Sequence, residues 1–192
     1  MKRIAGVDEA GRGPLVWAVV AASVIFEDNY DLSDFKDSKK LSEKKRNILY
    51  KKIKIDSISY AIGVATAQEI DEINIHNATL LAMKRAIEGL STKPSNILID
   101  GKFVPKGLVI PAQAIIKGDS LEPVISAASI LAKVTRDEMM YELHEKHPEF
   151  NFAKHKGYPT KEHLEAINKY GIISEHRKTF GKLSDFKWLL VC

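Results

Sequence analysis

Short apolar runs open the chain, and segments with helical spacing follow them. Residues 18–26 are apolar apart from one serine, which predicts a strand buried on both faces, and residues 57–65 alternate apolar and polar positions as a half-covered strand does. Apolar positions three and four residues apart predict a helix that begins after Ser42 and a longer helix over residues 123–147. Strands come first and then alternate with helices, so the pattern predicts an α/β fold with a mixed sheet flanked by helices.

Capping residues indicate where further helices begin and end. A capping-box pattern at Thr66 predicts a short helix over residues 66–73, and Asn77 is expected to begin the next helix. Thr160 is expected to begin a last helix, which Gly171 ends.

Three apolar segments are each followed by an acid. Residues 3–7 run into Asp8 and Glu9, residues 97–99 run into Asp100, and residues 114–116 lie just before Asp119. Because strand ends can converge in the crevice beyond an α/β sheet, the four acids are expected to lie close together. Adjacent residues of a regular strand face opposite ways, so we expect the first strand to end or bulge at its two acids.

These four acids favour a divalent metal. Hard oxygen ligands suit Mg²⁺ or Mn²⁺, and no spacing of histidine and cysteine indicates zinc. A pair of such ions promotes in-line attack of water on a phosphodiester. The residues alone leave an alternative open, because Asp100 and Asp119 each adjoin a glycine and such pairs are typical of turns.

The composition is that of an ordinary globular protein. The 192 residues are expected to form a single domain, residues 1–192, in which about residues 149–192 form a small helical appendage. The longest apolar run, residues 15–26, is too short to span a bilayer, so no membrane partner is expected. The single cysteine, Cys192, fits a reducing compartment, which favours the cytoplasm. A net charge of +4 permits a polyanionic partner.

Six distinctive segments are spread along nearly the whole chain. In order they are VDEAGRGPL (7–15), DSKKL (37–41), IDG (99–101), KGDS (117–120), AASILAKVTRD (127–137) and HKGYPT (155–160). Together, and in their spacing, they resemble the motifs of type 2 ribonuclease H, the ribonuclease HII family.

The resemblance implies a fold and a reaction. The fold would be ribonuclease-H-like, a mixed five-stranded sheet flanked by helices with a small C-terminal helical extension. Asp8, Glu9, Asp100 and Asp119 would be the catalytic, metal-binding set for Mg²⁺ or Mn²⁺, in a two-metal mechanism. The enzyme would cleave the RNA strand of RNA–DNA hybrids and incise 5′ to single ribonucleotides embedded in duplex DNA, leaving 3′-hydroxyl and 5′-phosphate ends.

The same resemblance implies the contacts with nucleic acid. Gly11, Arg12 and Gly13 would read the ribose 2′-hydroxyl, Tyr158 would pack on the sugar at the RNA–DNA junction, and Lys39 would contact phosphate. The partners would be RNA–DNA hybrid and ribonucleotide-containing duplex DNA, bound by a monomer.

One residue departs from the family pattern. Trp17 stands where the family usually has glycine, and if that position has a positive φ the tryptophan is strained there by about 1 kcal/mol or more. Two alternatives to the ribonuclease remain, the second of them because of this departure. One is another nuclease of the same fold, and the other is a non-catalytic module that binds hybrid or duplex.

Overall fold

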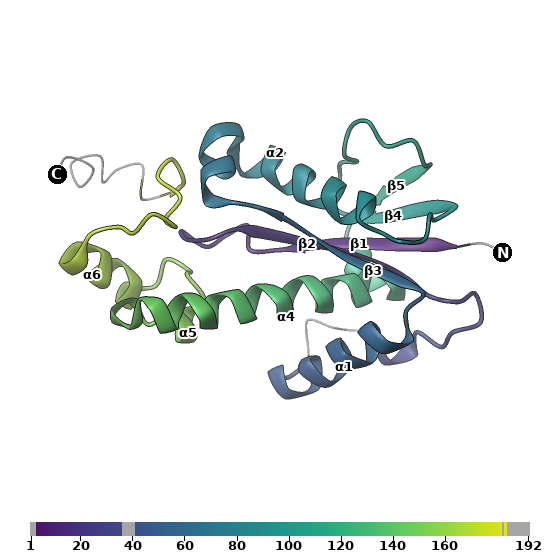
Figure 1. Ribbon diagram of the computed structural model, residues 1–192, viewed down its shortest axis with the longest axis horizontal. Coiled ribbons are helices and arrows are strands. Elements are labelled where there is room, and N and C mark those ends of the chain that lie inside the picture. The colour runs from purple at the N-terminus through teal and green to yellow at the C-terminus, as the bar shows by residue number, and fades with distance from the viewer. Residues whose placement is uncertain (1–2, 36–40, 182, 184–192) are drawn as a thin grey trace.

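The protein is built on a five-stranded mixed sheet, as expected. The computed structural model describes residues 3–35, 41–181 and 183 (Figure 1). Along the sheet the strand order is β3-β2-β1-β4-β5; β2 is antiparallel to β1 and β3, whereas β1, β4 and β5 are parallel. The strands are β1 (Ile4–Ala10), β2 (Val19–Ile25), β3 (Ser59–Ala65), β4 (Asn96–Asp100) and β5 (Ala112–Ile115).

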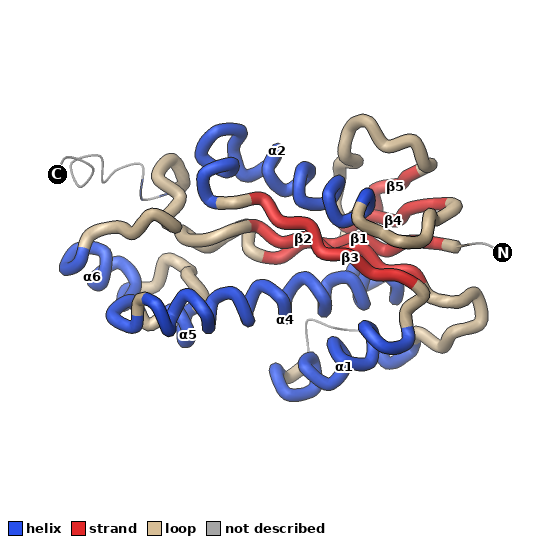
Figure 2. Tube along the Cα trace, in the orientation of Figure 1, coloured by secondary structure: helices blue, strands red, loops and turns tan. Residues whose placement is uncertain are grey.

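Helices cover both faces of this sheet (Figures 1 and 2). Helix α2 packs on one face and α4 on the other, with α1 lying against α4. The α-helices are α1 (Glu43–Asp56), α2 (Ala67–Glu88), α3 (Gly118–Leu121), α4 (Pro123–Lys146), α5 (Phe152–His155) and α6 (Lys161–Tyr170), and short 3₁₀ turns are η1 (Ser33–Phe35) and η3 (Pro148–Phe150). The described helices include none long and apolar enough to cross a membrane.

The side chains of β2 point alternately into two hydrophobic cores, one on each face of the sheet. Ala21 and Ile25 pack with α2, whereas Ala22 and Val24 pack with α4 and α1. All seven residues of β2 are therefore buried, as its uninterrupted apolar run predicts.

A third core forms at the far end of α4. There Leu15 and Val16 pack with Met140 of α4, Phe150 of η3 and Ile167 of α6. Thr160 caps α6 by accepting a hydrogen bond from the N–H of His163, and Gly171, with φ 80°, follows its last turn. The helical C-terminal region is thus present and rests on the segment that follows β1.

Two local predictions are wrong. The helix predicted to begin at Asn77 begins three residues earlier, because Asn74 has a non-helical backbone (φ 67°) and its side chain accepts a hydrogen bond from the N–H of Asn77. Asp119 does not end a strand: β5 stops at Ile115, and Asp119 lies in the first turn of α3.

Candidate active site

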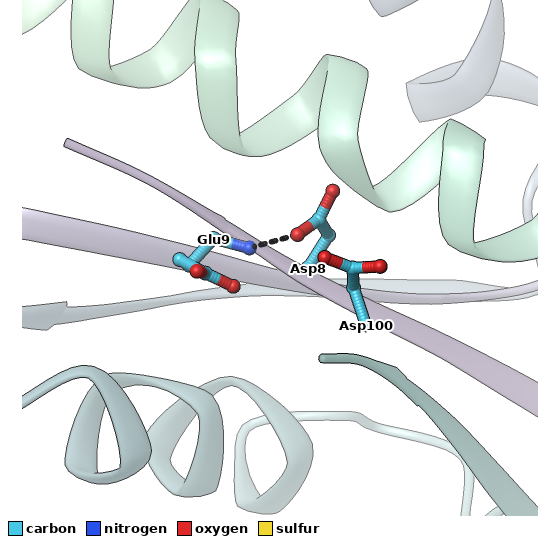
Figure 3. A group of neighbouring side chains, drawn as sticks. All are labelled: Asp8, Glu9 and Asp100. Atoms are coloured by element: carbon cyan, nitrogen blue, oxygen red, sulfur yellow. Dashed lines mark hydrogen bonds between the residues drawn. The ribbon is translucent and has the colours of Figure 1, made fainter. Parts of the chain in front are cut away.

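Three of the four predicted acids meet at the end of β4. One carboxylate oxygen each from Asp8, Glu9 and Asp100 lies within 4.8 Å of the other two (Figure 3). Asp8 and Glu9 come from β1, and Asp100 is the last residue of its parallel neighbour β4. The convergence predicted from the strand ends is therefore present for these three residues.

The geometry at Asp8 and Glu9 differs from the expected break. Strand β1 pairs with β2 without a bulge through Ala10. On its other side, pairing with β4 stops at Val7, so the following backbone has no strand partner there. The N–H of Glu9 instead donates to Oδ1 of Asp8 at 2.7 Å. The expectation of a strand end or bulge is wrong, because the end of the neighbouring strand, not of β1, opens the space for the carboxylates.

Asp119 lies beside this group without belonging to the same 4.8 Å set. Its backbone N–H donates to Oδ1 of Asp100 at 3.3 Å, and its charge helps to raise the pKa of Asp8. Gly118 permits the approach, because a Cβ there would lie 2.6 Å from the Ile125 side chain and 3.4 Å from Oδ1 of Asp100.

These acids are buried or half-buried and repel one another, and little positive charge lies close enough to offset this. Burial, and then the charges of Glu9 and Asp100, raise the pKa of Asp8 well above its ordinary value, and burial raises the pKa of Glu9. Among the described residues, Arg12 forms the one salt bridge to Asp8, Glu9 or Asp100, a long contact of 3.5 Å to Glu9. Oε2 of Glu9 is buried with no hydrogen-bond partner in that part of the chain. Such a set of oxygen atoms fits a divalent cation.

Asp8 and Glu9 line a cleft of about 450 Å³ that basic side chains line as well. Arg46 of α1 and Lys133 of α4 are among these basic lining residues, and Lys133 also forms an ion pair with Asp137 at 2.7 Å. Sequence reasoning missed Arg46 as a lining residue, although it ends the lysine-rich stretch from which Lys39 was chosen. Lys39 itself lies outside the described residues.

The predicted contacts Gly11, Arg12, Gly13 and Tyr158 line the same cleft. Gly11 has φ 95°, and a Cβ on Gly13 would lie 3.1 Å from the ring of Tyr158, which is 45% exposed. Among the described residues, the backbone N–H groups of positions 11–13 donate to no other backbone group. They are therefore available to a ligand.

Trp17 adopts a backbone conformation that is strained for a residue with a side chain. Its φ is 69°, in the left-handed region. Its N–H donates to the carbonyl of Glu175 at 2.8 Å, and its own carbonyl accepts from Nε of Arg177 at 2.8 Å. Sequence reasoning missed Arg177 entirely, because its partners are backbone carbonyls, which carry no sequence signal.

Comparison with known proteins identifies the family. The family model described as Ribonuclease HII matches residues 5–187. The chain belongs to the ribonuclease HII family. It is 54% identical to ribonuclease HII of Neisseria meningitidis serogroup B and 53% identical to that of Neisseria gonorrhoeae, in each case over 92% of this chain and 91% of the relative.

Solved structures agree with this assignment. The crystal structure of ribonuclease H2 from Pyrococcus horikoshii OT3 superposes with a TM-score of 0.81 at 26% identity, covering 99% of this chain and all of that one. The ribonuclease-H-like fold implied by the motifs is confirmed. The chain is a ribonuclease H, an endonuclease that hydrolyses phosphodiester bonds.

Proposed function

We propose that this ribonuclease HII cleaves the RNA strand of RNA–DNA hybrids and incises 5′ to single ribonucleotides in duplex DNA, leaving 3′-hydroxyl and 5′-phosphate ends. The observation that carries the proposal is that one cleft is lined both by Asp8 and Glu9 of the acidic group and by the Gly11–Arg12–Gly13 turn. A reacting phosphate and the sugar that identifies it as RNA would be held in that single space.

Asp8, Glu9, Asp100 and Asp119 would hold Mg²⁺ or Mn²⁺, two ions in the presence of substrate. The fit rests on three carboxylates within 4.8 Å and on the buried Oε2 of Glu9 that lacks a hydrogen bond within the described chain. When bound, such ions lower the pKa of water and neutralise charge on the scissile phosphate. The hydrogen bond from the Glu9 N–H fixes the Asp8 carboxylate in its orientation before any ion arrives.

Ribonucleotide selection would come from the turn. The N–H groups of residues 11–13 have no backbone partner in the described chain. Gly11 and Gly13 allow the side chains of Arg136 and Tyr158 to pack directly against this turn, since a Cβ would lie 2.1 Å from Nε of Arg136 or 3.1 Å from the ring of Tyr158. The 2′-hydroxyl is the group that distinguishes RNA from DNA, and backbone N–H groups can donate to it. Tyr158, against Gly13, would pack on the sugar at the junction, while Arg12 and Lys39 would contact phosphate.

We propose further that the enzyme acts as a monomer, a single domain over residues 1–192, in the cytoplasm. The residues that line the cleft lie both before and after position 149, which supports a single domain. A single cysteine fits a reducing compartment.

The test uses a DNA duplex with one embedded ribonucleotide, incubated with the protein and Mg²⁺ or Mn²⁺. We expect one cut, on the 5′ side of the ribonucleotide, and no cut in the all-DNA duplex. Asp8→Asn should reduce the rate by more than about a hundredfold, because it removes a charge from the metal site. The same substitution should abolish the rise in melting temperature that the metal gives to the wild-type protein.

Glu88→Gln is the matched control, because Glu88 is an exposed residue of α2 outside the cleft. It should cut like the wild type. Equal cutting of the all-DNA duplex would indicate a nuclease that ignores ribose, and binding without any cutting would indicate a non-catalytic module. Either result contradicts the proposal.

A further inference from the structure

Arg177 donates its side-chain hydrogen bonds to a single loop. The residue is 0% exposed, and its guanidinium contacts backbone carbonyls between positions 11 and 18. Nε donates to Trp17 (2.8 Å), Nη1 to Arg12 (3.1 Å) and Pro14 (2.7 Å), and Nη2 to Gly11 (2.6 Å) and Ala18 (3.2 Å). A guanidinium has five N–H groups, so its whole donor capacity serves this loop.

The hydrogen bonds of Arg177 go to uncharged carbonyl groups, so they orient the guanidinium without neutralising its charge. No carboxylate among the described residues forms a salt bridge with Arg177, although Asp71 is near enough to favour its charged form. Burial, and then the nearby Arg136, lower the pKa of Arg177 to about 9, so it stays charged at neutral pH. The planar fork of arginine suits several fixed carbonyls at once, whereas lysine offers one point of attachment.

Apart from Arg177, the supports of the loop lie at its far end, where Arg136 donates to the carbonyl of Val16 at 3.3 Å and the N–H groups of Leu15 and Trp17 donate to Gly157 and Glu175 at 2.8 Å each. Gly11 and Trp17 both have positive φ, at 95° and 69°. The N–H groups of residues 11–13 have no backbone partner in the described chain, and these are the groups proposed to bind the sugar. A turn with these properties would sample other conformations without an external support.

Arg177 belongs to a short segment, residues 175–180, which we call the strap. Its N–H donates to the carbonyl of Leu15 at 2.9 Å. The carboxylate of Asp71 accepts from the N–H groups of Lys178 and Thr179 at 3.0 and 2.9 Å and from the Thr179 hydroxyl at 2.8 Å. The ring of Phe180 lies 5.5 Å from the guanidinium. The strap therefore connects α2 to the loop that lines the cleft.

We propose that Arg177 is a positioning residue for ribonucleotide recognition: it holds residues 11–18 in the conformation that presents the N–H groups of residues 11–13 to the sugar. This inference rests on the proposed function, since it concerns the same cleft. It assigns to the C-terminal strap a part in substrate discrimination, through a residue that does not line the cleft.

The test measures how strongly a duplex with one ribonucleotide is preferred over the same all-DNA duplex, by fluorescence anisotropy in EDTA and by cleavage rates with Mg²⁺. Arg177→Lys keeps the positive charge but loses the planar guanidinium and its five N–H donors. We expect its preference to fall at least tenfold, with a rise in KM larger than the fall in kcat. Binding to the all-DNA duplex should stay close to that of the wild type.

A second readout is independent of substrate. With Trp188 replaced by phenylalanine in every variant, emission comes from Trp17, whose carbonyl binds Arg177. Arg177→Lys should make this emission more accessible to acrylamide. Ile25→Ala, a cavity in the core at the other end of β2, serves as a control that lowers stability without touching the loop, and it should leave preference and quenching unchanged.

Asp71→Ala provides a milder change if Arg177→Lys does not fold, because it loosens the strap and leaves the arginine in place. It should lower the preference in the same direction but by less. A preference unchanged in the folded Arg177→Lys and Asp71→Ala variants, or one lost equally in Ile25→Ala, would overturn the inference. A wild-type protein that neither prefers nor cuts ribonucleotides would instead overturn the proposed function.

Discussion

Trp17 has a backbone conformation that ordinarily favours glycine. Its φ of 69° brings Cβ close to the following carbonyl, which costs about 1 kcal/mol or more. The conformation persists because its N–H and carbonyl are bound by Glu175 and Arg177, and because the half-buried indole packs on the third core. The strain is thus offset by contacts that residues far away in the sequence supply.

Replacing Trp17 by glycine and by alanine separates the strain from the packing. Both changes remove the indole, but only glycine accepts the positive φ without strain. We expect Trp17→Gly to be more stable than Trp17→Ala by about 1 kcal/mol in urea unfolding. The same pair at Ile55, an 81% exposed position in α1, should give the opposite order, since alanine is favoured within helices. Equal stabilities of the two Trp17 variants would show that the backbone relaxes freely.

The roles of some residues could be predicted from the sequence, whereas those of others could not. Asp8 and Asp100 could be predicted because apolar runs lead into them and the strand order brings such ends together. The capping role of Asn74 and the fork of Arg177 could not be predicted, because each depends on backbone groups whose position only the folded chain defines.

At the scale of elements, the distance between β1 and α4 determines how far the acids of β1 lie from Lys133 of α4. Gly6 lies where the two approach most closely, since a Cβ there would lie 2.2 Å from the carbonyl oxygen of Val124 and 2.7 Å from the N of Ile125. These are backbone atoms in the first turn of α4, which cannot move aside as a side chain can. Lys133 lies on the same helix, so its distance from the acids of β1 depends on this contact.

Gly6→Ala should therefore push α4 away from the sheet. We expect a loss of more than about 2 kcal/mol in the free energy of unfolding, together with slower cleavage, because overpacking forces the helix to shift. Gly171→Ala is the control for strain alone, since Gly171 has φ 80° and ψ −172° and a Cβ there would meet no described atom within 4 Å. That backbone region is essentially restricted to glycine, so the change should cost about 1–3 kcal/mol in stability but leave the cleavage rate of the folded protein unchanged. A Gly6→Ala protein as stable as the wild type would mean that the contact is not tight.

The elements themselves were largely predictable, and the connections less so. The apolar run of β2 and the spacing of α4 correspond closely to the predicted strand and helix. The turn into α3 was missed because Lys117 has φ 59°, a conformation that the sequence gives no reason to expect at a lysine. As a result Asp119 sits on a helix, although it still lies next to Asp100.

At the scale of the whole molecule, the C-terminal region is connected to the cleft by a chain of buried histidines. The N–H of Ile173 donates to Nδ1 of His176, whose Nε2 lies 3.2 Å from Nε2 of His163. Nδ1 of His163 lies 3.0 Å from the carbonyl of Tyr158. Satisfying all three contacts requires both rings to be neutral, with His176 donating to His163 and His163 donating to Tyr158. The strap and the cleft residue Tyr158 therefore depend on the same protonation state.

This arrangement predicts that the free energy of unfolding falls with decreasing pH already above the range in which carboxylates ordinarily titrate. Burial is the main cause that lowers the pKa of His163 to about 4 and that of His176 to about 3, whereas both would titrate near about 6.5 in the unfolded chain. Between these values the unfolded chain binds more protons, so the stabilising contribution is complete above about pH 6.5 and is lost as the pH falls.

From about pH 7.5 to about pH 5, each histidine should cost about 2 kcal/mol in the free energy of unfolding, measured with urea. His176→Asn removes one titrating ring, so its stability should fall less steeply over the same interval. The raised pKa values of Asp8 and Glu9 act in the opposite direction, since protonation relieves their repulsion, but that contribution is common to both proteins and cancels in the difference. Parallel pH profiles for the wild type and His176→Asn would show that His176 is not held neutral by the fold.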